Sequence, residues 1–73
     1  MKNIETLIED GGEITIGVIA GSECCATAAD GHNALAILAR RDGETISALL
    51  RRLDKAIGRY YLTDETTDEI NPP

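Results

Sequence analysis

The strongest pattern in the 73-residue chain is an amphipathic stretch that follows Thr45. At about 100° per residue, its apolar side chains occupy one sector and most of its basic side chains occupy the opposite one. Thr45 is a typical N-cap, so we expect a helix of about 16 residues from this point. Gly58 either lies inside this helix, at a cost of about 1 kcal/mol relative to alanine, or ends it early. The apolar sector contains Ile46, Leu49, Leu50, Leu53, Ala56, Ile57, Tyr60 and Tyr61.

The residues before this helix predict a short helix and then a sheet. Residues 3–10 place apolar side chains on one helical face, with Asn3 as the N-cap and Gly11-Gly12 as the stop. Three runs with strand character begin at Glu13, Glu23 and His32. The predicted fold is α+β: a short N-terminal helix, a three-stranded antiparallel β-meander, one long amphipathic helix packed on the sheet, and an acidic C-terminal tail. We expect residues 1–62 to form a single domain and residues 63–73 to be a loosely ordered tail, with Ile70 as an anchor.

Two dipeptides predict how the strands pair. Gly21-Ser22 and Asp30-Gly31 are typical of two-residue hairpin turns. Such turns would pair Val18 with Cys25, and Cys25 with Ala36, unless a bulge shifts the register. In that register neither sheet face is polar, and the face away from the long helix is apolar and rich in alanine. We therefore predict that the first helix or a second copy covers it, and we favour a homodimer formed through a sheet face.

Composition excludes several classes of function. The chain carries a net charge of −6 and contains two Tyr, no Trp and no Phe, which disfavours nucleic-acid binding. No apolar run approaches the roughly 20 residues that span a bilayer, so no membrane contact is expected. Cys24 and Cys25 are adjacent, so a disulfide between them could not link distant segments of the chain. A chain with no such disulfide is typical of a reducing cytoplasm. A domain this small without a disulfide or metal gains most from a partner subunit.

The residues that could support catalysis or bind metal are few. Cys24, Cys25 and His32 are the soft metal ligands of the chain. Adjacent strand residues point to opposite faces, so the two thiols are not expected to share a metal ion. Carboxylates are numerous but scattered, and paired acids act in catalysis only when a cleft holds them together. We predict no catalytic residue, no metal and no cofactor; a metal- or thiol-dependent protein is kept as an alternative.

Charge segregation is the main functional signal. Six of the seven basic residues lie between Arg40 and Arg59, and they are followed by an acidic segment. Either the acidic tail or the first helix lies over the basic residues and neutralises them, or the basic residues bind an acidic protein surface or phosphates. The predicted partner-binding residues are Arg51, Arg52, Lys55, Arg59, Arg40 and Arg41, and the acidic residues of the tail are Asp64, Glu65, Asp68 and Glu69.

Part of the chain, residues 32–73, is similar to a known kind of protein. The stretches 40–46 and 49–57, together with the acidic ending at 67–73, resemble small uncharacterised proteins of bacterial prophages and mobile elements. The resemblance implies a non-enzymatic interaction protein that binds a host or phage protein in the bacterial cytoplasm. The alternative it implies is an anti-CRISPR or other anti-defence inhibitor. Such an inhibitor would mimic nucleic acid through the acidic first helix and tail.

Overall fold

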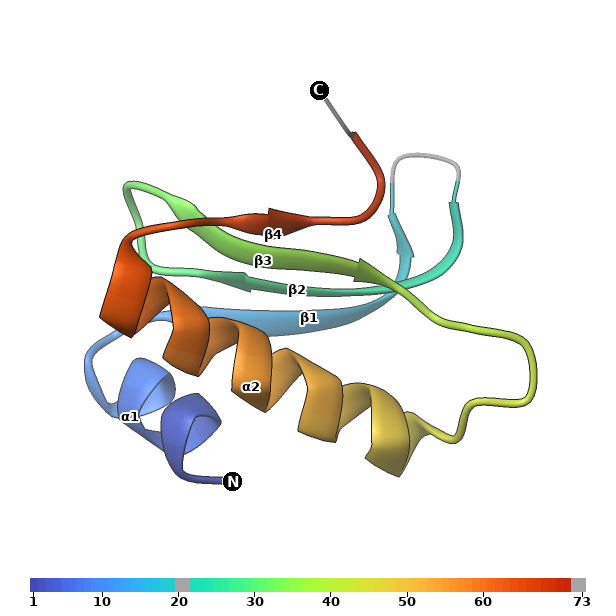
Figure 1. Ribbon diagram of the computed structural model, residues 1–73, viewed down its shortest axis with the longest axis horizontal. Helices are drawn as coiled ribbons and strands as arrows, with labels where there is room; N and C mark the ends of the chain where they lie inside the picture. Colours follow the sequence, from blue (N-terminus) through green and yellow to red (C-terminus); the bar gives the residue numbers. More distant parts are fainter. Residues whose placement is uncertain (20–21, 72–73) are drawn as a thin grey trace.

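The computed structural model describes residues 1–19 and 22–71 (Figure 1). Within these residues the strands form a four-stranded sheet in the order β1-β2-β3-β4, and both helices lie on the same face of it (Figure 1). The fold is therefore α+β, as predicted. The elements in chain order are α1 (Lys2–Glu9), β1 (Glu13–Ile19), β2 (Ser22–Ala29), β3 (Ala34–Ala39), α2 (Ile46–Thr63) and β4 (Thr67–Asp68).

The fourth strand corrects the predicted meander. β1, β2 and β3 pair antiparallel, as expected, but β4 adds to β3 in parallel. Thr67 pairs with Ala36, and the Glu69 N–H donates to the Ile37 carbonyl over 2.8 Å. The segment predicted as a loosely ordered tail thus contributes to the sheet, and Ile70 in it is half-buried. A parallel strand needs a crossover from its neighbour, and α2 supplies that connection.

The predicted register of the first hairpin is wrong by one residue. Cys25 pairs with Gly17 and not with Val18, because the pairing shifts between Gly17 and Ile19. Between the pairs Gly17–Cys25 and Ile19–Ser22, β1 has one residue and β2 has two, so the extra residue of this bulge lies in β2. Gly17, beside the bulge, has φ = 149°, a conformation that favours glycine. Ser22 already belongs to β2, where it pairs with Ile19. The other half of the predicted Gly21-Ser22 turn lies outside the described residues.

The second hairpin departs further from the prediction. Cys25 pairs with Ala39 and not with Ala36, and β3 begins at Ala34 rather than at His32. The connection comprises residues 30–33 instead of a two-residue turn. Its geometry comes from Asp30, whose Oδ1 accepts the backbone N–H groups of His32 and Asn33 over 2.9 and 2.8 Å. Such a side-chain cap stabilises a longer turn that the Asp-Gly dipeptide alone does not reveal.

The corrected register changes the composition of both sheet faces. Pairing places Thr15, Thr27 and Ile37 in one row across the sheet on the side away from the core. This side therefore carries two threonines, and by the same pairing it also carries Ala29 and Ala39.

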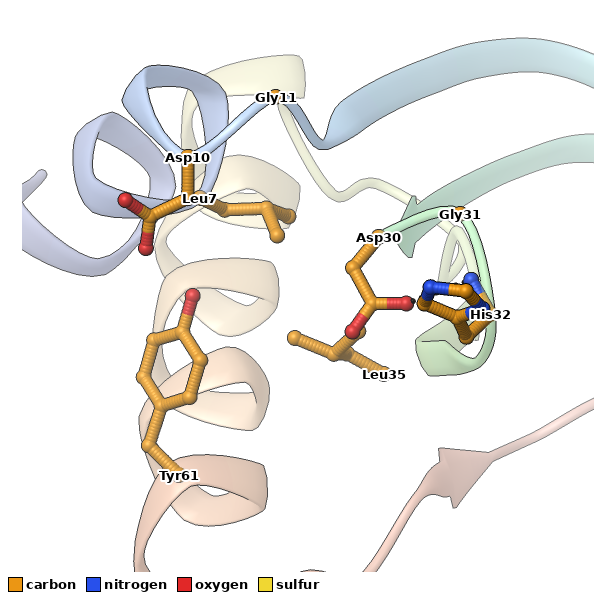
Figure 2. Close-up of a pocket in the computed structure, with 8 residues that line it drawn as sticks. All are labelled: Leu7, Asp10, Gly11, Asp30, Gly31, His32, Leu35 and Tyr61. Carbon is orange, nitrogen blue, oxygen red and sulfur yellow. Dashed lines mark hydrogen bonds between the residues drawn. The ribbon is translucent and has the colours of Figure 1, made fainter.

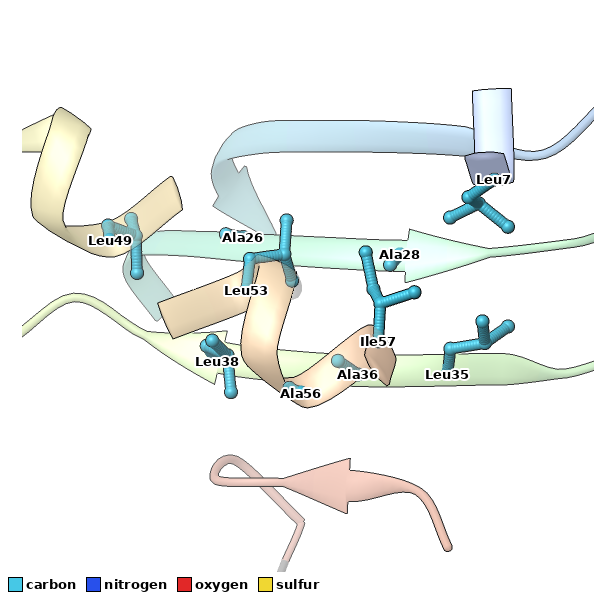
Figure 3. Close-up of a cluster of buried hydrophobic side chains, with 10 residues drawn as sticks. All are labelled: Leu7, Ala26, Ala28, Leu35, Ala36, Leu38, Leu49, Leu53, Ala56 and Ile57. Carbon is cyan, nitrogen blue, oxygen red and sulfur yellow. The ribbon is translucent and has the colours of Figure 1, made fainter. Parts of the chain in front are cut away.

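The core lies between the sheet and the two helices (Figure 3). Leucine and isoleucine side chains of α2 point at strand positions occupied by alanine, and Leu7 extends the cluster from α1. Small residues on the strands let the helix approach closely, and the larger helical side chains fill the space. The buried cluster is Leu7, Ala26, Ala28, Leu35, Ala36, Leu38, Leu49, Leu53, Ala56 and Ile57.

The long helix begins as predicted. Thr45 is the N-cap of α2, and its hydroxyl accepts the N–H of Ala48 over 3.0 Å. The helix continues through Gly58 to Thr63 and ends at Asp64, which has a left-handed conformation with φ = 63°. Gly58 is therefore inside the helix and does not end it.

Asn3 joins the two helices instead of capping the first. Met1 occupies the N-cap position of α1, which corrects the prediction for Asn3. The Asn3 amide donates to the carbonyl oxygen of Asp54 over 3.1 Å, and Asp54 Oδ1 accepts the Ile4 N–H over 2.9 Å. Gly58 makes room for this contact, because a Cβ there would lie 2.6 Å from Asn3 Nδ2.

Candidate functional site

The six basic residues predicted to bind a partner divide into two groups. Arg52 is bound within the chain: its Nε lies 2.7 Å from Glu44 Oε2 and its Nη1 lies 3.0 Å from Glu69 Oε2. Its Nη2 also donates to the Ala39 carbonyl over 2.8 Å. The hydrogen bonds from the Arg52 guanidinium and then from the Arg41 N–H hold the pKa of Glu44 at about 2. The bonds to Glu44 and Glu69 raise the pKa of Arg52 above its ordinary value. Arg52 thus connects α2 to the end of β3 and to the segment after β4.

Arg40 and Arg41 contact the same two residues, Glu44 and Glu69, through one side-chain contact each. Arg40 Nε donates to the Glu44 carbonyl over 2.7 Å, and Arg41 Nη2 lies 4.0 Å from Glu69 Oε2. Both residues are exposed, but their contacts belong to the loop that leads into α2. In this half of the basic set, Arg41 and Arg52 lie against carboxylates of the chain itself, and Arg40 lies against a backbone carbonyl.

The second group lies on the solvent-exposed side of α2. Arg51, Lys55 and Arg59 follow one another at intervals of four residues, and all three are exposed. Arg51 donates to Ser47 Oγ over 3.1 Å, and Arg59 pairs with Glu65 over 3.2 Å. No ion pair involves Lys55 among the described residues. Leu62 continues the line at its C-terminal end and is 88% exposed, the largest exposed fraction among the large apolar residues described.

A groove lies beside this line, where α1 crosses α2. Its volume is about 570 Å³, and we call it the basic groove. Lys55 and Arg59 supply its charge, and Tyr61 and Leu62 supply its apolar surface. Asn3 and Gly58 also line the groove, so the close contact between the helices shapes it. A groove of this composition suits a ligand that presents carboxylates next to an apolar side chain.

A second depression, which we call the acidic hollow, lies between α1, the turn that follows β2 and the end of α2 (Figure 2). Its volume is about 370 Å³. The Tyr61 ring extends across it with the phenol oxygen directed toward α1 (Figure 2). The residues that give it its chemical character are Leu7, Asp10, Asp30, His32, Leu35 and Tyr61.

Charge in the acidic hollow is negative. The N–H groups of Asn33 and His32 lower the pKa of the Asp30 carboxyl, so this group stays ionised at neutral pH. Burial, and then the charges of Asp10 and Asp30, raise the pKa of the Tyr61 phenol, which stays neutral. The hollow thus combines carboxylates, a phenol and leucine side chains. Sequence reasoning missed it because its residues come from three separate segments that share no motif.

The acidic residues predicted for the tail serve different structural roles. Asp64 ends α2, Glu65 pairs with Arg59, and Glu69 pairs with Arg52. Asp68 Oδ1 accepts the N–H groups of Ile70 and Asn71, and these bonds lower the pKa of its carboxyl. The four carboxylates are therefore spread over α2, the sheet edge and the turn after it.

The structure separates the cysteines from His32. Cys25 is fully buried and Cys24 is half-buried, and both are free thiols. Ala29 is four residues after Cys25 in β2, which corresponds to about 13 Å of strand. His32 lies beyond Ala29, in the turn, and is exposed. Ala34, and not His32, pairs with Ala29. Across the described ranges, no three histidine, cysteine or acidic side chains form a metal-binding group.

Comparison with known proteins adds no assignment. No protein-family model matches the chain, and no match to a curated protein or to a solved structure was found. Neither of the two helices in the described residues has the length and hydrophobicity required to cross a bilayer.

Proposed function

We propose that this chain is a non-enzymatic interaction protein that binds an acidic protein surface through the exposed side of α2. The observation that supports the proposal is the line of three exposed basic residues that ends in the exposed Leu62, with the basic groove beside it. Arg51, Lys55 and Arg59 repel one another along the helix, and an acidic partner would remove that repulsion. The phage or mobile-element origin and the cytoplasmic location expected from the sequence are part of this proposal.

The contacts that these residues make within the chain are weak enough to exchange. Arg59 and Glu65 are both largely exposed, and surface pairs of this kind contribute at most about 1 kcal/mol. A partner carboxylate could therefore replace Glu65 at little cost. Arg52 differs, because releasing it would break its bonds to Glu44, Glu69 and the Ala39 carbonyl together. We therefore assign partner binding to Arg51, Lys55 and Arg59, and a structural role to Arg52.

The apolar part of the site gives it specificity. A helix that offers only basic residues binds acidic surfaces weakly, and its affinity falls as the salt concentration rises. Leu62 and Tyr61 offer a partner an apolar contact between the charges, and buried apolar anchors of this kind often dominate binding energy. The partner should therefore carry an apolar side chain flanked by carboxylates.

Selection from a random peptide library displayed on phage tests this proposal without a known partner. We expect the peptides that bind the wild-type protein to be acidic with an apolar residue among the acids. Their affinity, measured by fluorescence anisotropy, should fall at least about tenfold with Lys55→Glu or Leu62→Asp. Lys2→Glu is the matched control, because it reverses an exposed lysine in the other helix. Peptides without acidic residues, or equal binding to Lys55→Glu, would overturn the proposal.

A further inference from the structure

The basic groove and the acidic hollow are neighbours. Tyr61 lines both of them, so the two depressions adjoin at this side chain. Their lining residues come from α1, the C-terminal part of α2 and the segment around the turn after β2, and these parts of the chain come together at one end of the molecule (Figure 1). This end of the protein therefore presents carboxylates on one side of Tyr61 and basic side chains on the other.

We infer that the acidic partner of the basic groove is a second copy of this chain, docked about a two-fold axis beside Tyr61 and Leu62. This inference rests on the proposed function and names the partner. In a two-fold interface the same surface is used by both copies, so its two sides must complement each other. Here Lys55 and Arg59 of one copy enter the acidic hollow of the other, and the reciprocal contact forms across the axis.

Apolar surface lies at the centre of this arrangement. Leu62 is 88% exposed and Tyr61 is 47% exposed, and both would be covered beside the axis. A stable interface buries roughly 800 Å² on each partner. The whole chain exposes 4762 Å² and measures 29 × 27 × 19 Å, so one end of it can supply such an area. Dimerisation would also stabilise a domain whose core is limited by its size.

The charges of the acidic hollow suit a basic side chain from the second copy. Asp30 stays ionised, and its carboxylate and the Leu35 side chain both line the hollow (Figure 2). Leucine side chains and the Tyr61 ring can pack against the aliphatic stem of a lysine or arginine while the carboxylates bind the charged end. The interface is thus complementary in both charge and polarity.

Reciprocal charge reversal tests this arrangement. One variant carries Asp10→Lys and the other carries Lys55→Glu with Arg59→Glu. We leave Asp30 unchanged because its carboxylate shapes the turn after β2. Sedimentation equilibrium over a concentration series should show a wild-type dimer, and each variant alone should dissociate at least tenfold more readily. An equimolar mixture of the two should form a heterodimer, which native mass spectrometry identifies by mass.

Circular dichroism verifies that each variant is folded, and Lys2→Glu should leave the wild-type dimer unchanged. A wild-type monomer, a dimer that persists in both variants, or a mixture that fails to form the heterodimer would overturn the inference. The peptide selection separates this failure from that of the proposed function. Acidic peptides that bind wild type and lose affinity with Lys55→Glu would keep the proposed function while the second copy is rejected.

Discussion

Gly58 allows a quantitative test of how the two helices are held together. In an exposed helix interior, Gly→Ala stabilises by about 1 kcal/mol, because alanine loses less backbone entropy. At Gly58 the new methyl group would lie 2.6 Å from Asn3 Nδ2 and 3.3 Å from Asn3 Cγ. Asn3 must therefore move, and it would lose its hydrogen bonds to the carbonyl and carboxylate of Asp54, which measure 3.1 and 3.3 Å.

The two effects of Gly58→Ala oppose each other. Losing the Asn3 hydrogen bonds costs about 1–2 kcal/mol, which offsets or exceeds the gain in helix propensity. We expect Gly58→Ala to lower the free energy of unfolding by about 0–1 kcal/mol in the wild-type chain. With Asn3→Ala already present, the same substitution should raise it by about 1 kcal/mol, since the obstacle is gone.

Urea unfolding followed by circular dichroism, on the four proteins of this cycle, measures the coupling energy directly. A coupling of about 1–2 kcal/mol between positions 3 and 58 is expected, and a difference of 1 kcal/mol also moves the thermal midpoint by about 4–8 °C. If Gly58→Ala stabilised the wild-type chain and the Asn3→Ala variant equally, the contact between Asn3 and Asp54 would contribute nothing to stability, and the reasoning would be refuted.

Two further predictions concern the ion-pair cluster and the core. Glu44 has a pKa of about 2 in the folded protein against an ordinary 4.5, so its contribution to stability is fully present above about pH 4.5 and is lost as the pH falls toward 2. The free energy of unfolding should therefore fall more steeply between pH 5 and pH 2 in wild type than in Glu44→Gln, as measured by urea titrations across this range; identical slopes would contradict this assignment. Leu53→Ala, which removes a fully buried side chain above the strand alanines, should lower the free energy of unfolding by about 2–5 kcal/mol in the same assay. Leu62→Ala is its control at the exposed end of the helix and should change stability by less than about 0.5 kcal/mol.

The elements governed by local chemistry could be predicted from the sequence. The long helix and its Thr45 cap follow from a period of 3.6 residues and from a hydroxyl three residues before the N–H it accepts. Strand pairing could not be predicted, because it depends on a bulge in β2 between Ser22 and Cys25 and on a four-residue turn capped by Asp30. β4 was missed for another reason: two polar residues show no periodicity, and tertiary contacts hold them at the edge of β3.

In the candidate site, too, some features follow from the local sequence and others only from tertiary contacts. The basic line along α2 could be read from residue spacing alone. The sequestration of Arg52 could not, because it requires Glu44 and Glu69, from two different segments, to converge on one guanidinium. The acidic hollow is likewise a product of tertiary structure, since Asp10, Asp30 and Tyr61 are separated by at least 20 residues along the chain.

The parallel strand β4 also determines when the sheet can be completed during synthesis. β1, β2 and β3 are made consecutively and can pair as local hairpins as they leave the ribosome. Once β3 has emerged, its edge stays unpaired while α2 emerges, until residues 67–69 follow and Glu69 reaches Arg52. An open edge strand is a template for pairing with other chains. The nascent chain is therefore most exposed to misassociation in the interval between the third strand and the fourth.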